Sequence, residues 1–159
     1  MRYHFFKQEM ENWCVPACLQ SILNKHGFRV PLQEEIYKSL ETNQEGVIIN
    51  ESNLDSFLQK YELSSQYTHP RLSFPEMDFV LEESFKNKRD VLVAFYHNPK
   101  NRHCTLLTNI NHEELTLHCL KERTRIISFS DLISLMPLDY QCGFYIVSHA
   151  SGQEFQSAG

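Results

Sequence analysis

The sequence has little glycine, lacks a long hydrophobic run and carries no excess of positive charge. Only 5 of its 159 residues are glycine, and they form no glycine-rich loop of the kind that holds phosphates or dinucleotides. No apolar run approaches the roughly 18 residues that a membrane helix needs, so no membrane span is predicted. The formal net charge of −5 argues against binding to nucleic acids or anionic membranes by bulk electrostatics.

No secretory signal is predicted, and the cysteines are odd in number. The opening stretch MRYHFFKQEMENWC holds too short an apolar region, and acidic residues follow it at once. Without a signal, the 5 cysteines indicate reduced thiols in a cytoplasmic protein rather than a disulfide framework. Three of them, Cys18, Cys104 and Cys142, are interpreted as small buried hydrophobic residues.

Composition and apolar spacing predict one α+β domain over residues 1–149. Hydrophobic residues make up 42% of the chain and aromatic residues 12%, which is typical of a globular protein. Helices are predicted from Cys14 to Gly27, over 32–40 and 54–61, and from Ser73 onward, with a loop at 41–49. Strands are predicted at 91–96, 103–110, 115–120, 125–129 and 143–148, with a short helix at 131–136. Helices followed by antiparallel strands indicate the α+β class, and the small polar residues 150–159 predict a mobile tail.

The stretch QEMENWCVPACLQSIL, residues 8–23, carries the strongest chemical signal. Cys14 stands where a loop becomes a helix, and Pro16 suits the first turn because its missing N–H would be unpaired there. A thiol at this place feels the positive end of the helix dipole, which favours the nucleophilic thiolate. Gln8 lies upstream and His103 lies far downstream. Together they suggest a cysteine nucleophile, a distant base and an amide donor for an oxyanion.

These residues resemble the nucleophile motif of the double-glycine-leader (bacteriocin-processing) peptidases, which belong to the papain-like superfamily. Gln8, five intervening residues, Cys14 and then Val-Pro-Ala-Cys-Leu are similar to the family's Gln-x5-Cys-Gly-Pro-Ala-Cys/Ala-Leu at the head of a helix. The segment RHCTLLTNI, residues 102–110, resembles the family's His-apolar-Val-Val strand. The resemblance covers residues 5 to 148. It implies a papain-like fold, with the nucleophile on the helical half and the histidine on the antiparallel sheet.

The same resemblance implies a cysteine peptidase, or a related acyl-transfer enzyme, that needs no cofactor or metal. Its substrate would be a peptide or protein, cleaved after a small Gly-Gly-type pair in a leader. Cys14 is predicted as the nucleophile, His103 as base and later acid, and Gln8 as oxyanion donor beside the Cys14 N–H. Three other histidines compete with His103 for its role, namely His97, His112 and His118.

Two positions depart from the family pattern. Val15 replaces the glycine that usually follows the nucleophile, and Cys119 stands where the family carries the aspartate that orients the histidine. His118 is the nearest polar substitute if the strand shifts by one residue, and Glu122 is the nearest acid. The remaining alternative is that no third catalytic residue exists.

Two other functions compete with the peptidase. The missing aspartate favours a degenerate peptidase domain that binds peptides without cutting them. A zinc site is the third hypothesis. Two cysteines one helical turn apart and two His-Cys pairs are plausible ligands, although their spacing matches no standard zinc finger. These ligands would come from Cys14, Cys18, His103-Cys104 and His118-Cys119. The pattern specifies neither an oligomeric state nor an activating partner.

Overall fold

The computed structural model describes residues 3–10, 13–40, 42–43, 46–47, 49–71, 73–98, 101–118, 124–137 and 142–150. Its helices are α1 (Cys14–Lys25), α2 (Gln33–Ser39), α3 (Glu51–Leu58), the 3-10 turn η1 (Gln59–Tyr61), α4 (Phe74–Lys86) and α5 (Phe129–Ser134). Its strands are β1 (Thr42–Asn43), β2 (Gly46–Val47), β3 (Leu63–Thr68), β4 (Asp90–Asn98), β5 (Asn101–Asn111), β6 (Glu114–His118), β7 (Thr124–Ser128) and β8 (Gly143–His149).

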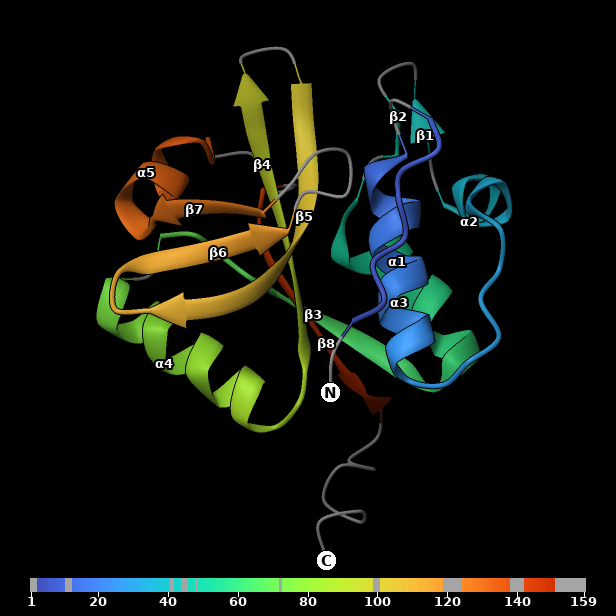
Figure 1. The fold of residues 1–159 in the computed structure, drawn as a ribbon, viewed down its shortest axis with the longest axis horizontal. Coiled ribbons are helices and arrows are strands. Elements are labelled where there is room, and N and C mark those ends of the chain that lie inside the picture. The colour runs from blue at the N-terminus through green and yellow to red at the C-terminus, as the bar shows by residue number, and fades with distance from the viewer. Residues whose placement is uncertain are drawn as a thin grey trace, which may run out of the picture.

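An antiparallel six-stranded sheet, in the order β3-β8-β4-β5-β6-β7, forms the centre of the fold. The helices α1, α2 and α3 lie on one side of this sheet, and α4 and α5 lie on the other (Figure 1). The short pair β1-β2 forms a separate ribbon. This arrangement confirms the predicted α+β class.

Strand β4 separates two hydrophobic cores. Successive side chains of a strand point to opposite faces, so its continuous apolar run is buried on both. Leu92 and Ala94 belong to the core under α1, whereas Val91, Val93 and Phe95 belong to the core under α4 and α5. Any residue paired with β4 can therefore be assigned to one face or the other.

Helix α1 is enclosed on all sides. Every residue from Val15 to Leu23 is buried, which is typical of a helix inside a core rather than on its surface. One side of α1 packs against β5, where the Cys18 thiol lies 3.7 Å from the Cys104 carbonyl oxygen. Another side is covered by the N-terminal segment, whose Phe6 N–H donates to the Ser21 hydroxyl at 3.2 Å. The helix is thus held firmly with Cys14 at its first residue.

The structure differs from the expected elements at a few places. The predicted loop 41–49 contains β1 and β2, and a strand that was not predicted, β3, follows η1. The sequence of β3, LSSQYT, lacks the alternating apolar pattern that predicts a strand. It forms a strand at the edge of the sheet because it pairs with β8. The predicted tail falls almost wholly outside the described residues, since only Ala150 of it is described.

A buried ionic cluster joins three parts of the chain at the end of α1. Asp90 is fully buried and accepts bonds from Lys25 at 2.6 Å and from the Tyr3 hydroxyl, and His26 Nε2 lies 2.8 Å from its other oxygen. Burial by itself raises the pKa of Asp90, but the contacts with His26, Lys25 and Tyr3 outweigh it and hold the pKa below its usual value. The cluster ties the N-terminal segment and the start of β4 to the last turn of α1.

Candidate active site

Cys14 is the first residue of α1, and its thiol is free and half-buried. The N-cap residue is Trp13, whose side chain makes no capping hydrogen bond, and the first turn contains no acidic residue. The first N–H groups of a helix have no partner within the helix, and its dipole is positive at this end. The start of α1 therefore places a thiol where negative charge is favoured.

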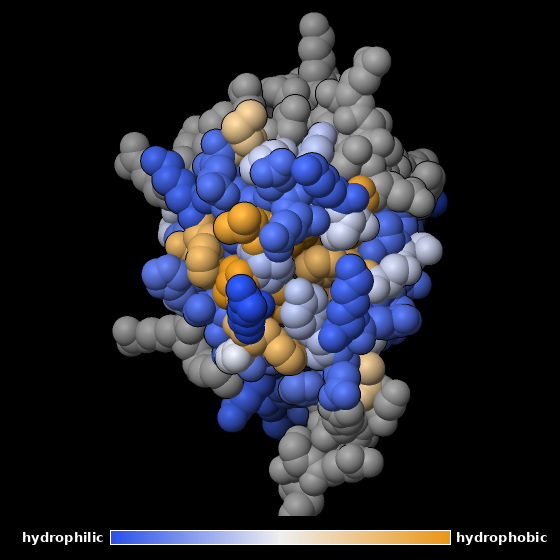
Figure 2. Space-filling model, turned by 90° about the vertical axis from the view of Figure 1, so that its right-hand side faces the viewer, coloured by the Kyte–Doolittle hydropathy of each residue, from blue (hydrophilic) through white to orange (hydrophobic). Residues whose placement is uncertain are grey.

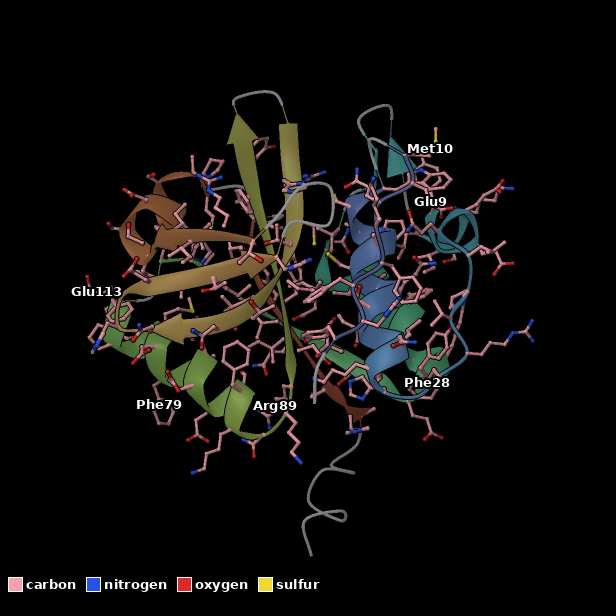
Figure 3. The ribbon with its side chains drawn as sticks, viewed as in Figure 1. Glu9, Met10, Phe28, Phe79, Arg89 and Glu113 are labelled. Atoms are coloured by element: carbon pink, nitrogen blue, oxygen red, sulfur yellow. The ribbon has the colours of Figure 1, made fainter. Side chains whose placement is uncertain are left out.

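The Gln8 side chain is fixed beside the start of α1. Its amide donates to the Met10 carbonyl oxygen at 2.7 Å, and the Trp13 N–H donates to the same oxygen at 3.1 Å. Gln8 is 9% exposed, so its side chain is largely buried rather than on the surface. Figure 3 shows the neighbouring Glu9 and Met10 at the end of the molecule where α1 begins. The structure thus brings Gln8 and Cys14 to the same end of α1.

Aromatic and apolar side chains adjoin this end of the helix. The rings of Trp13 and Tyr37 of α2 pack together with centroids 5.4 Å apart, and both side chains are half-buried. Met10 and Leu32 are large hydrophobic residues that remain 56% and 64% exposed. On the side of the molecule that carries α2, Figure 2 shows apolar side chains interspersed with hydrophilic ones. Met10 therefore leaves apolar surface exposed beside the turn that leads into Cys14.

Strand β5 begins at the same end of the molecule as α1. Figure 1 shows the two elements side by side and running in the same direction. Cys18 and Cys104 are in contact, Cys14 lies one helical turn before Cys18, and β5 starts a few residues before Cys104. One turn of helix and two strand residues both advance by about 5 to 7 Å. The first residues of β5 are therefore level with Cys14.

His103 nevertheless faces away from α1. It pairs with Phe95 of β4, and the two rings pack edge to face with centroids 5.9 Å apart. Phe95 belongs to the core under α4 and α5, on the face of the sheet opposite α1. The structure brings His103 to the level of Cys14 but does not place its ring on the same face.

The neighbouring Arg102 takes the α1 face instead. Alternation along β5 puts it on the same face as Cys104, which belongs to the core under α1. Burial raises the pKa of Tyr145, another residue of that core, and the Arg102 charge acts to lower it, so the guanidinium lies near. Within the described residues, one buried Arg102 nitrogen, Nη1, has no hydrogen-bond partner. Sequence reasoning missed Arg102, although the alternation Arg102, Cys104, Leu106 was a signal that could have found it.

His118 lies on the α1 face but away from Cys14. It pairs with Leu106 of the core under α1, and its ring stacks on Phe5 with centroids 3.5 Å apart. The adjacent Phe6 is bonded to Ser21, which lies about 10 Å further along α1 than Cys14. Burial lowers the pKa of His118. The structure therefore does not bring His118 together with His103, which faces the other way.

The remaining candidates are less informative. Cys119 and Glu122 lie outside the described residues. Cys18, Cys104 and Cys142 are buried, in line with their interpretation as small hydrophobic residues. Among the residues with described positions, no group of three or more His, Cys, Asp or Glu side chains is arranged to hold a metal ion. The described helices also include none that is long and apolar enough to cross a membrane.

Comparison with known proteins adds a family and a fold. The sequence profile of the peptidase C39 family matches residues 2–135. One similar solved structure is a double glycine motif protease from an AMS/PCAT transporter, in complex with the leader peptide. It has a TM-score of 0.61 and 15% identity, covering 91% of this chain and 89% of that one. Another is the peptidase domain of Streptococcus ComA, a bi-functional ABC transporter involved in a quorum sensing pathway. It has a TM-score of 0.61 and 13% identity, covering 90% and 96%. No curated protein shows a significant match.

Proposed function

Because the chain belongs to the peptidase C39 family and has its papain-like fold, we propose that it is a cysteine peptidase acting on peptides. The observation that carries the proposal is the placement of Cys14 and Gln8 at one end of α1, where the Met10 carbonyl holds the Gln8 amide and the Trp13 N–H. The proposal covers a single domain over residues 1–149. Its substrate class is a leader-type peptide cut after small residues, as the leader-peptide complex of the AMS/PCAT protease suggests.

The proposed reaction is an acyl transfer. The Cys14 thiolate attacks the carbonyl carbon of the scissile peptide bond and forms a thioester, while the Gln8 amide and the Cys14 N–H donate to the oxyanion. His103 removes the thiol proton and later protonates the leaving amine. Water then attacks the thioester and releases the second product, which restores the thiol.

A peptide-binding module is the second candidate, and the direction of His103 favours it. In this structure the His103 ring packs on Phe95, so proton transfer with Cys14 requires the ring to leave that face of the sheet. A domain that keeps this arrangement would bind peptides next to the Cys14 thiol without the His103 ring on the α1 face of the sheet. The two candidates therefore differ in whether Cys14 forms an acyl intermediate.

Selective alkylation of Cys14 is the first expected result. Iodoacetamide near neutral pH should label Cys14 well before Cys18, Cys104 and Cys142, because Cys14 is half-buried at a helix start and the other three are buried. Peptide mapping by mass spectrometry measures the order of labelling. Cys14→Ser is the control, since it should remove the fast site and leave the slow ones unchanged. Uniform labelling, or labelling led by Cys142, would count against a nucleophile.

Gln8→Ala is expected to lower kcat by about 10²- to 10³-fold with a much smaller change in KM. An oxyanion donor acts mainly in the transition state, so its loss slows chemistry more than it weakens binding. Steady-state cleavage of a fluorogenic peptide with a Gly-Gly pair measures both constants. Gln66→Ala, an exposed glutamine on β3, serves as the matched control and should change neither. A change confined to KM would assign Gln8 to substrate binding.

A further inference from the structure

One buried side chain holds the backbone on both sides of Gln8. Gln33, the first residue of α2, is 2% exposed. Its Nε2 donates to the Lys7 carbonyl oxygen at 2.8 Å, and its Oε1 accepts from the Glu9 N–H at 3.0 Å. A side-chain amide bonded in this way pairs with a backbone segment much as a neighbouring strand would. Because both flanking peptide groups are held, the direction in which the Gln8 side chain leaves the backbone is set.

The Gln33 amide is itself oriented by α1. Its Nε2 also donates to Gln20 Oε1 at 2.8 Å, and Gln20 Nε2 donates to the Pro31 carbonyl oxygen at 2.9 Å. If the Gln33 amide were flipped, its NH₂ group would face the Glu9 N–H, and its oxygen would face the Lys7 and Gln20 oxygens. These contacts cannot form hydrogen bonds, so only one orientation of the amide fits. Gln20 is 6% exposed. The chain of bonds therefore runs from inside α1, through α2, to the residues next to Gln8.

Packing alone does not explain why two glutamines are buried in this core. Burial of an amide costs free energy unless each polar atom finds a partner, and apolar residues of similar volume would fill the same space. A fully bonded buried network instead confers one geometry. Here that geometry is transmitted to a residue whose amide is fixed at the Met10 carbonyl, on the turn that leads into Cys14.

We propose that Gln33, oriented by Gln20, is a positioning residue that aims the Gln8 amide at the oxyanion. The proposal rests on the proposed function, because Gln33 acts only through Gln8 and touches no reacting atom. A misplacement of about 1 Å in such a site lowers the rate by about 10²-fold. The hydrogen bonds of Gln33 and Gln20 therefore contribute to kcat, although neither side chain reaches the reacting atoms.

The test is a double-mutant cycle between Gln33→Met and Gln8→Ala. Methionine keeps the volume of Gln33 and removes its hydrogen bonds, so Gln33→Met should lower kcat by about tenfold to a hundredfold and change KM by less than about threefold. In the Gln8→Ala background, Gln33→Met should lower kcat no further. Glu34→Gln, an exposed neighbour on α2, is the control for substitutions in this helix. Equal losses of kcat in both backgrounds would overturn the proposal, because a merely structural role does not depend on Gln8.

A second measurement is independent of turnover. In Gln33→Met the Glu9 amide should exchange its hydrogen at least about tenfold faster, and the NMR signals of the Gln8 side-chain amide should move to random-coil values. Should the parent protein cut no peptide while these changes appear, the peptidase proposal fails and the positioning of Gln8 stands. If the parent is active and the Gln8 signals do not move, the positioning proposal fails alone. Gln20→Met, which leaves both bonds from Gln33 to the backbone in place, should give a smaller change in the same direction and replaces Gln33→Met if that variant does not fold.

Discussion

Arg102→His is expected to raise the rate of peptide cleavage by at least about tenfold, since a placed general acid–base group contributes typically 10²- to 10⁴-fold. The reason is the alternation of β5. Arg102 lies on the α1 face level with Cys14, whereas the His103 ring packs on Phe95 at the opposite face. An imidazole at position 102 would lie on the α1 face of the sheet, which is the face that a Cys14–His pair needs. The measurement is kcat/KM for the fluorogenic Gly-Gly peptide.

Two variants separate the imidazole from the loss of the guanidinium. Arg102→Gln removes the positive charge without supplying a base, so it should not reproduce the gain. His103→Ala in the Arg102→His background should leave the gain in place if the new imidazole acts alone. A gain of equal size in Arg102→Gln would mean that the arginine merely obstructs the site. No gain in a folded Arg102→His variant, together with peptide binding but no acyl-enzyme in the parent, would favour the binding module.

Asp90→Ala is expected to lower the free energy of unfolding by about 3–5 kcal/mol, the usual cost of removing one partner from a buried ion pair. The loss arises because Lys25, whose side chain is only 7% exposed, is left without the carboxylate that neutralises it. Urea denaturation followed by circular dichroism measures the difference. The surface pair Lys38–Glu34 offers the matched control: its side chains are 72% and 60% exposed, and Glu34→Ala should cost no more than about 1 kcal/mol. Equal losses in the two variants would show that the Asp90 cluster contributes no more than a surface contact.

The same cluster predicts how stability depends on acid. The folded pKa of Asp90 lies below its usual value of 3.8, so the unfolded chain binds its proton at the higher pH. This contribution is fully present above about pH 4 and is lost as the pH falls through the lowered folded pKa. In Asp90→Ala the free energy of unfolding should therefore fall less steeply as the pH is lowered below about 4. An unchanged slope in this range would contradict the assigned direction of the shift.

Local sequence determined a large part of the fold and the position of Cys14 at the start of α1. The helix from Cys14 begins with Pro16 in its first turn and ends before Gly27, whose φ of 80° suits glycine. The predicted helix from Ser73 onward is α4, and the Ser73 hydroxyl caps it by accepting from the Glu76 N–H. Runs of apolar residues located most of the strands, within one or two residues at their ends. These signals are readable because each depends on residues that are neighbours in the chain.

Pairing between distant segments decided the rest. The edge strand β3 exists through its bonds to β8. Gln33 meets the backbone of Lys7 and Glu9 only when α2 packs on the N-terminal segment, and Asp90 meets Lys25 across the fold. The face of His103 is the clearest case. Side chains alternate with a period of two along a strand, so a shift of one residue in pairing exchanges the faces of His103 and Arg102. The motif located the histidine in the chain, but only the register of β5 against β4 determines which side chain faces Cys14.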